Sequence, residues 1–355
     1  MTEDGASGAT LIGSERPLQE AFDVALLDLD GVVYRGAQDV PHAADAVATA
    51  REVGMGTMFV TNNAARSPQT VARHLTDLAV PTGPEEVTTA AQAAAALVAS
   101  EADAQTRVLA IGGDGLREAL LAEGLTVVDS AREAPTVVVQ GFAPTLGWSD
   151  LAEAVYAING GATFIASNTD ATLPTERGMA PGNGSLVAAV VHATGVRPRS
   201  TGKPQPEIFQ QAAERSGARR PLVVGDRLNT DLAGALAAGF PGLHVLTGVD
   251  GINEVLRAAP CERPNFLARD LRGLAEAHPQ PLRTGSMWTC RGAIALVRDG
   301  RVMLHRGEAE LAFGDTRVSM DEFRAGAAAA WDASDASGTD TVLIQDERPV
   351  QLISD

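Results

Sequence analysis

The sequence predicts an α/β protein: a Rossmann-like, doubly wound parallel-sheet core with an inserted α/β cap domain and a small C-terminal α+β module. Short, continuously apolar runs such as Val24-Ala25-Leu26-Leu27 alternate with segments of helical spacing such as Asp45 to Val53. Continuous apolar runs are typical of strands buried on both faces of a parallel sheet, and their alternation with helices indicates βαβ units. With 355 residues, the chain is long enough for two or three domains.

The individual elements follow from local signals. Gly54 ends the first helix, and Met58-Phe59-Val60-Thr61 is the next buried strand. Ser67 as N-cap and Pro68 at the first helical position open a helix that runs toward Leu78. Further strands are expected at 108–111, 137–140, 163–166, 222–226 and 243–246. We expect a flexible tail over 1–19 and a discontinuous core domain over 20–90 and 197–277, with an inserted domain over 91–196.

A separate module follows the core. The stretch His278-Pro279-Gln280-Pro281 reads as a linker. In the module, residues 283–355, Asp299-Gly300 joins two apolar runs and predicts a hairpin. A helix is expected at 321–331 and a strand at 341–344. The module carries no chemical motif, so we expect it to act as a lid or a dimer surface, which makes a homodimer an expected assembly.

The composition excludes several classes of protein. Apolar content of 45% and charged content of 21% are those of a globular chain, and no run approaches the roughly 18 apolar residues of a membrane helix. The net charge of −17 disfavours nucleic acid as a partner. The N-terminus lacks the features of a signal peptide, so we expect a cytoplasmic location with Cys261 and Cys290 as free thiols.

The first candidate motif is Asp28-Leu29-Asp30-Gly31, at the carboxyl end of a predicted strand. Open α/β sheets bind ligands at that edge. Two neighbouring carboxylates resist ionising together, so one attacks as a nucleophile while the other carries a proton. Gly31 permits a sharp turn and leaves room for a phosphate. Alone, the motif is equally common as a loop or calcium-site fragment.

Three other segments add the remaining chemistry. Thr61-Asn62-Asn63 offers a hydroxyl and backbone amides for phosphoryl oxygens, although a capped turn is the simpler interpretation of these residues alone. Lys203, between Gly202 and Pro204, is placed to neutralise a carboxylate and a phosphate, whereas most single lysines are solvated. Asp226, with Asp231 in support, suits Mg²⁺. Because Asp28, Thr61 and Asp226 each end a buried strand, we expect one sheet edge to gather them.

These segments in this order resemble the four motifs of the haloacid dehalogenase superfamily, over roughly residues 20–275. The resemblance is to its phosphatases with a type II cap, in the nitrophenylphosphatase and phosphoglycolate or glycerol-phosphate phosphatase branch, and it implies that the inserted domain over 91–196 is this type II cap. The stretches Ala166–Asp170 and Pro181–Ser185 carry the likeness to this branch; Thr169 departs from it, where many relatives have Pro or Met. The family leaves the last seventy residues unexplained, whereas actinobacterial glycerol-3-phosphate phosphatases of similar layout carry an acetyltransferase-like fragment there.

The resemblance implies Mg²⁺-dependent hydrolysis of a small phosphate monoester through an aspartyl-phosphate. Its expected catalytic residues are Asp28, Asp30, Thr61 and Lys203, with metal ligands Asp28, Asp30 (through its carbonyl) and Asp226. Expected substrate contacts are Thr61, Asn62, Asn63, Asn168, Asp170, Gly182, Gly184 and Lys203. Glycerol 3-phosphate is the favoured substrate, with phosphoglycolate, sugar phosphates, nucleotides and pyridoxal phosphate as alternatives.

Two other functions use similar residues. A dehalogenase on the same fold attacks carbon, needs no metal and has no use for Asp30 or Asp226. A receiver-like phospho-switch has a phospho-accepting Asp, Mg²⁺, Thr and Lys, but lacks the second carboxylate and the inserted cap. The stretch Gly112-Gly113-Asp114-Gly115 imitates a dinucleotide fingerprint, but Glu118 stands where its third glycine should fall, so a helix-capping turn is expected.

Overall fold

The computed structural model describes residues 11–36, 38–175, 177–337 and 350–353. The chain divides into two compact units, residues 1–57 with 218–355 and residues 58–217. The domain boundaries expected from the sequence fall elsewhere, at 90/91 and 196/197, and stay a prediction. The strand expected at 341–344 lies outside the described residues.

The core of the first unit is a parallel sheet. Strand β1 (Val24–Leu27) pairs with β13 (Pro221–Gly225), β13 with β14 (Gly242–Val245), and β14 with β15 (Phe266–Ala268), all in parallel. Every residue of these four strands is buried, as their continuous apolar character predicts. The elements around this sheet are the helices α1 (Leu18–Ala21), α2 (Ala43–Glu52), α9 (Ala233–Ala238) and α10 (Ile252–Leu256), the π-helix η3 (Leu228–Leu232), the 3₁₀ helices η4 (Pro260–Glu262) and η5 (Leu271–Ala275), and the hairpin β2 (Tyr34–Arg35) with β3 (Gln38–Asp39).

The first unit also contains the C-terminal module. Its five antiparallel strands follow chain order: β16 (Leu282–Thr284), β17 (Met287–Cys290), β18 (Ala293–Arg298), β19 (Arg301–Arg306) and β20 (Ala309–Ala312). The turn η6 (Phe313–Asp315) leads to the helix α11 (Met320–Ser337). Asp299 and Gly300 both have positive φ and close the predicted β18–β19 hairpin.

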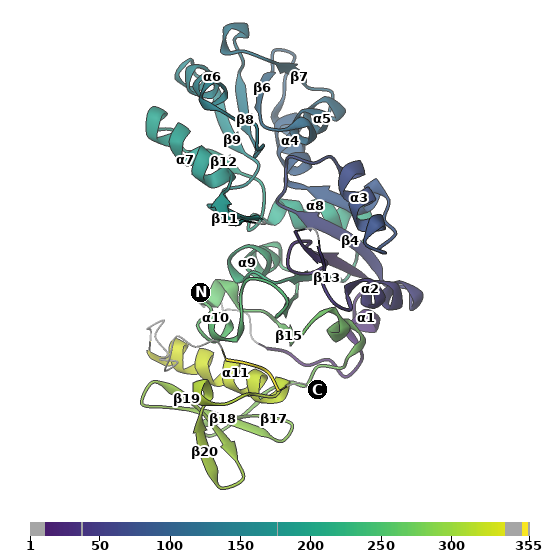
Figure 1. Cartoon of the computed structure of the whole chain (residues 1–355), viewed down its shortest axis with the longest axis vertical. Helices are drawn as coiled ribbons and strands as arrows, with labels where there is room; N and C mark the ends of the chain where they lie inside the picture. Colours follow the sequence, from purple (N-terminus) through teal and green to yellow (C-terminus); the bar gives the residue numbers. More distant parts are fainter. Residues whose placement is uncertain (1–10, 37, 176, 338–349, 354–355) are drawn as a thin grey trace, which may run out of the picture. The chain divides into compact units, whose positions relative to one another are not determined.

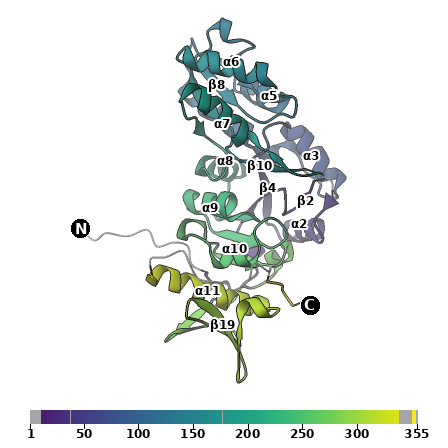
Figure 2. The same ribbon diagram turned by 60° about the vertical axis from the view of Figure 1, so that its left-hand side comes forward.

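Helix α11 lies between the module's sheet and α10, as both Figure 1 and Figure 2 show. One apolar cluster joins α11 residues such as Phe323 and Trp331 to Val255 and Leu256 of α10 and to Leu304 of β19. The module therefore shares a core with the sheet-bearing part of its unit.

The described part of the predicted N-terminal tail is packed, which corrects the expectation of a flexible tail for residues 11–19. Leu11 and Leu18 are buried, and Ser14 forms a β-bridge with His278. The sequence did not indicate this packing, because partners such as His278 lie far along the chain. Cys261 and Cys290 are free, as expected.

The second unit contains a five-stranded parallel sheet in the order β12-β9-β8-β6-β7. Helices α4 and α5 cover one face of this sheet, and α6 and α7 cover the other (Figure 1). Successive strand residues such as Val108 and Leu109 enter opposite clusters, which is why both faces read as apolar. The bounds are α4 (Ala90–Glu101), β6 (Arg107–Ile111), α5 (Asp114–Ala122), β7 (Thr126–Val128), η2 (Ala131–Glu133), β8 (Val137–Gln140), α6 (Trp148–Asn159), β9 (Thr163–Ala166), α7 (Asn183–Thr194) and β12 (Arg199–Ser200).

The remaining elements of this unit include those next to the predicted Thr61 and Lys203 motifs. Strand β4 (Gly56–Thr61), most of which belongs to this unit, pairs in parallel with β5 (Val87–Thr89). The other elements are α3 (Pro68–Asp77), η1 (Pro84–Glu86), the hairpin β10 (Thr172–Thr175) with β11 (Gly178–Pro181), and α8 (Pro206–Ser216). Gly113 is the N-cap of α5, so the Gly112–Gly115 stretch is the expected helix-capping turn.

Candidate active site

Three buried carboxylates meet in the first unit. One carboxylate oxygen each of Asp28, Asp226 and Asp231 lies within 4.8 Å of the others. Asp28 follows β1 and Asp226 follows β13, and the Asp28 amide donates to Val224 O at 2.9 Å, so the strand pairing continues up to the carboxylates. In the described part of the chain, these residues are the one acidic, histidine or cysteine group of this size that is close enough to hold a metal ion.

The donor set of this acidic group fits a hard divalent cation. Mg²⁺ binds through one or two carboxylates and keeps several of its waters, and all three side chains here offer oxygen. Asp231, expected only to support the metal ligands, lies within the group itself. Its Oδ2 accepts a hydrogen bond from the Arg227 amide at 3.1 Å, which orients the carboxylate.

Two glycines make room for the Asp226 carboxylate. A Cβ atom at Gly31 or at Gly248 would overlap this carboxylate. Gly31 also has φ +91°, which side chains rarely adopt. The sequence interpretation gave Gly31 the task of leaving space for a phosphate, whereas the group that a side chain at this position would meet is the Asp226 carboxylate. Gly248 was not singled out by the sequence.

The loop Thr247–Asp250, hereafter the β14 loop, bonds both to Asp226 and to the turn at Gly31. The Val249 amide donates to Asp226 Oδ2 at 2.7 Å, and the Asp250 amide donates to Asp226 O at 3.1 Å. The Thr247 hydroxyl donates to Gly31 O at 2.6 Å. The loop thus fixes both the carboxylate and the turn after Asp28. Its position directly after a predicted strand was the sequence signal that could have identified it.

Two titratable groups stabilise the β14 loop. Asp250 Oδ2 accepts the Leu228 amide at 2.7 Å, and burial raises the pKa of Asp250 in spite of that bond. His244 is fully buried on β14, and burial lowers its pKa to about 4, so it is neutral at pH 7. The neutral ring can donate from Nε2 to Asp250 O at 3.0 Å.

In the second unit, Asn62 holds Lys203 by its backbone. Asn62 Oδ1 accepts the Lys203 amide at 2.8 Å, and Asn62 Nδ2 donates to Lys203 O at 3.1 Å. The same Nδ2 contacts the Asp170 carboxylate at 3.1 and 3.2 Å. A Cβ at Gly202 would overlap Ser167 O and crowd Asn62 Oδ1, so the Gly before the lysine permits this approach. Lys203 is 97% buried as a result of this packing.

The other predicted contacts in this unit have local partners. Asn63 Oδ1 accepts the amides of Ala65 and Arg66, and the Thr61 hydroxyl accepts the Asn63 amide at 3.1 Å. The Asn63 side chain therefore caps the turn, which leaves phosphate binding by this segment to its backbone amides and the Thr61 hydroxyl, as a prediction.

The predicted cap residues join the Asn62 network. Asn168 Nδ2 donates to Asn62 O at 2.8 Å, and Asn168 Oδ1 accepts the Asp170 amide at 3.1 Å. A Cβ at Gly182 or Gly184 would overlap the backbone of residues 169–172. These two glycines allow the start of α7 to pack against that backbone, so their structural task is separate from the predicted substrate contact.

The structure thus assembles two groups from the predicted residues. Within the first unit lie Asp28, Asp30, Asp226 and Asp231, and within the second lie Thr61, Asn62, Asn63, Asn168, Asp170, Gly182, Gly184 and Lys203. No helix in the described ranges combines the length and the apolar character needed to cross a bilayer.

Comparison with known proteins gives the family. A family model described as haloacid dehalogenase-like hydrolase matches residues 25–126, and a related model, described as HAD-hydrolase-like, matches residues 200–274. The D-glycerol 3-phosphate phosphatase of Mycobacterium tuberculosis is 42% identical over 327 residues, which is 90% of this chain and 88% of that protein. The acid sugar phosphatase of Staphylococcus aureus is 36% identical over 236 residues, 66% of this chain and 90% of that protein.

Solved structures agree. The glycerol phosphate phosphatase of M. tuberculosis in complex with magnesium has a TM-score of 0.80 and 38% identity, and the match covers 96% of both chains. A thermostable NPPase from Geobacillus stearothermophilus has a TM-score of 0.64 and 33% identity over 70% of this chain and 96% of its own. Since the match to the mycobacterial structure covers 96% of this chain, the likeness extends into the C-terminal module. By both sequence and fold, this chain belongs to the haloacid dehalogenase-like hydrolase family.

Proposed function

We propose that the protein hydrolyses a small phosphate monoester, with glycerol 3-phosphate as the favoured substrate and Mg²⁺ as cofactor. The observation that carries the proposal is the buried Asp28–Asp226–Asp231 group in a hydrolase of this family, in which Asp28 and Asp226 follow directly on paired strands. The relative named D-glycerol 3-phosphate phosphatase supports the choice of substrate, and the similar mycobacterial glycerol phosphate phosphatase structure in complex with magnesium supports the choice of metal.

Asp28 is the nucleophile in this proposal. Its carboxylate oxygen attacks phosphorus, the ester P–O bond breaks, and Asp30 gives its proton to the departing alkoxide. Asp30 then takes a proton from the water that attacks the aspartyl-phosphate, which releases inorganic phosphate and restores the Asp28 carboxylate. Mg²⁺ held by Asp28, Asp226 and the Asp30 carbonyl would neutralise phosphoryl charge.

The second group of residues completes the assignment. Lys203 balances charge on the phosphate and the Thr61 hydroxyl donates a hydrogen bond to it, while Asn168 and Asp170 are proposed to bind the substrate hydroxyls. Asn62 is proposed to act on Lys203, because its side chain already pairs with both backbone groups of that residue. A cytoplasmic location and a homodimer complete the proposal.

A second candidate substrate class has a specific observation behind it. The Staphylococcus relative is named an acid sugar phosphatase, and its match covers 90% of its own length. Sugar phosphates and glycerol 3-phosphate are both polyol monoesters, so the same hydroxyl-binding side chains would serve either.

A phosphate-release screen tests the proposal. The panel holds glycerol 3-phosphate, phosphoglycolate, sugar phosphates, a nucleotide and pyridoxal phosphate, each with Mg²⁺ and with EDTA, for the native protein and Asp28→Asn. We expect the highest kcat/KM on glycerol 3-phosphate, loss of activity in EDTA, and a fall in kcat of at least about a thousandfold in Asp28→Asn.

Other outcomes of the screen would redirect the proposal. Equal low rates on every ester contradict the substrate, and near-native turnover by Asp28→Asn contradicts the nucleophile. Metal-independent release of halide from a haloacid would indicate the dehalogenase. A stable phosphoprotein without phosphate release would indicate the receiver-like switch.

A further inference from the structure

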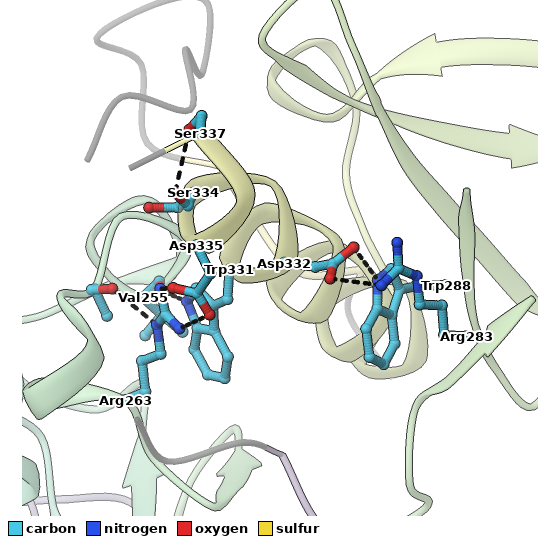
Figure 3. A network of polar contacts seen from close by, with 10 residues as sticks. Val255, Arg263, Arg283, Trp288, Trp331, Asp332, Ser334, Asp335 and Ser337 are labelled. Carbon is cyan, nitrogen blue, oxygen red and sulfur yellow. Dashed lines mark hydrogen bonds and ion pairs between the residues drawn. The ribbon is translucent and has the colours of Figure 1, made fainter. Parts of the chain in front are cut away.

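The C-terminal module contacts the core through a polar cluster near the end of α11 (Figure 3). Trp331 Nε1 donates to Val255 O, in α10, at 2.8 Å. Arg263 donates to both carboxylate oxygens of Asp335 at 2.7 Å each and to Ala258 O at 3.2 Å. The Arg263 guanidinium also lies 5.4 Å from the centre of the Trp331 ring. We call Arg263, Trp331 and Asp335 the clasp.

Burial gives the clasp its strength. The Arg263 side chain is 2% exposed and Trp331 is 4% exposed, so their donors have little access to water, whereas the Asp335 carboxylate that Arg263 binds is 54% exposed. A buried guanidinium that loses its carboxylate partner is strongly destabilised, and a buried carbonyl that loses its donor is also costly. Together, these bonds fix the C-terminal end of α10 and the segment after it against α11.

The other end of α10 adjoins the acidic group. Helix α10 begins at Ile252, two residues after Asp250 of the β14 loop, and Gly251 is its N-cap. The Gly251 amide donates to Glu254 Oε2 at 2.9 Å, which joins the loop to the first turn of the helix. The β14 loop in turn donates the Val249 amide to the Asp226 carboxylate. A displacement of α10 therefore moves a direct partner of Asp226.

We propose that the clasp positions the metal site: α11 fixes α10, α10 fixes the β14 loop, and the loop orients Asp226. This inference rests on the proposed function, in which Asp226 holds Mg²⁺. It gives the C-terminal module a role in the hydrolase, although the sequence of the module carries no chemical motif of its own. Arg263, Trp331 and Asp335 are positioning residues that act through the loop.

Helix α11 offers a matched control in Asp332. Its carboxylate accepts bonds from Arg283 at 3.0 Å and from Trp288 Nε1 at 3.4 Å, and both partners belong to the module itself (Figure 3). Asp332→Asn thus perturbs the same helix without touching α10.

The test measures Mg²⁺ binding in the full-length protein without substrate, from the rise of the unfolding temperature with Mg²⁺ concentration. Trp331→Phe keeps the ring packing and removes only the donor to Val255 O, and Asp335→Asn removes the charge partner of Arg263. We expect both variants to bind Mg²⁺ about threefold to tenfold more weakly, the effect of losing about one hydrogen bond. The Mg²⁺ concentration for half-maximal phosphate release should rise by the same factor, while Asp332→Asn stays at the native value.

Two results overturn the inference: native Mg²⁺ affinity in folded Trp331→Phe, or an equal loss of affinity in Asp332→Asn. Asp226→Asn separates this inference from the proposed function. If Asp226→Asn binds Mg²⁺ like the native protein, the proposed metal site is wrong and the clasp inference falls with it. If Asp226→Asn loses Mg²⁺ while Trp331→Phe retains native affinity, the clasp inference alone is wrong.

Discussion

The acidic group and the Lys203 segment are held in place by different means. Asp28 and Asp226 follow directly on strands that pair in parallel, so backbone hydrogen bonds of the sheet fix where their side chains start. Lys203 follows β12, a strand of two residues, and is held by the side-chain amide of Asn62, 141 residues away in the chain. Because the sheet fixes the backbone of the acidic group, the placement of its carboxylates depends mainly on the space left by Gly31 and Gly248. The placement of the Lys203 backbone depends on one polar side chain, that of Asn62.

The largest expected effect tests the room around the acidic group. In Gly248→Ala the new Cβ would overlap the Asp226 carboxylate, so Asp226 or the β14 loop must move. Overpacking of this kind costs about 1–3 kcal/mol, and we expect kcat/KM to fall about tenfold to a hundredfold. Gly292→Ala is the control, because nothing lies within 4 Å of its Cβ position. Equal activity of the two variants would mean that the Asp226 carboxylate can shift to accept the new Cβ without loss of function.

The next effect concerns acid sensitivity, which should belong to the first unit. His278 is 3% exposed, its Nε2 lies 2.9 Å from Gly273 O, and burial lowers its pKa to about 4. Between pH 6.5 and pH 4, the histidine of the unfolded chain, with an ordinary pKa near 6.5, is mostly protonated, whereas His278 in the folded protein stays neutral. The stability is therefore complete above pH 6.5 and declines as the pH falls toward 4, by about 2 kcal/mol between pH 7 and pH 5.

His278→Gln, which keeps a donor for Gly273 O, should remove this part of the pH dependence. Urea unfolding at pH 7 and pH 5 measures it, with the fluorescence of Trp288 and Trp331, both in the first unit, as the probe in a Trp148→Phe background. An unchanged difference between the two pH values would assign the acid sensitivity to other groups.

The smallest effect tests the Lys203 segment. Asn62→Asp removes the donor to Lys203 O and places a carboxylate beside that of Asp170. We expect kcat/KM to fall about tenfold, through a rise in KM, because the ammonium group of Lys203 is less well placed for the phosphate. The double variant Asn62→Asp/Asp170→Asn restores an amide–carboxylate pair and should recover part of the loss. No recovery would show that the Lys203 carbonyl bond alone matters.

The sequence determined the fold class and the acidic half of the site. Because parallel strands bring their carboxyl ends to the same edge of a sheet, continuous apolar strands followed by Asp28 and Asp226 predict that these two carboxylates lie close together. The Asp299-Gly300 hairpin and the start of α5 after Gly113 were equally local, since turn and cap geometry depend on a few adjacent residues.

Tertiary structure alone decided the rest. That Gly248 borders Asp226, that Asn62 holds the Lys203 backbone, and that Trp331 bonds to Val255 are contacts between segments distant in the chain. No periodicity or spacing encodes such contacts, because one glycine, amide or indole looks the same in the sequence whatever packs against it. The sequence therefore named the charged groups of the site, and the packing of the chain decided which neutral residues hold them in place.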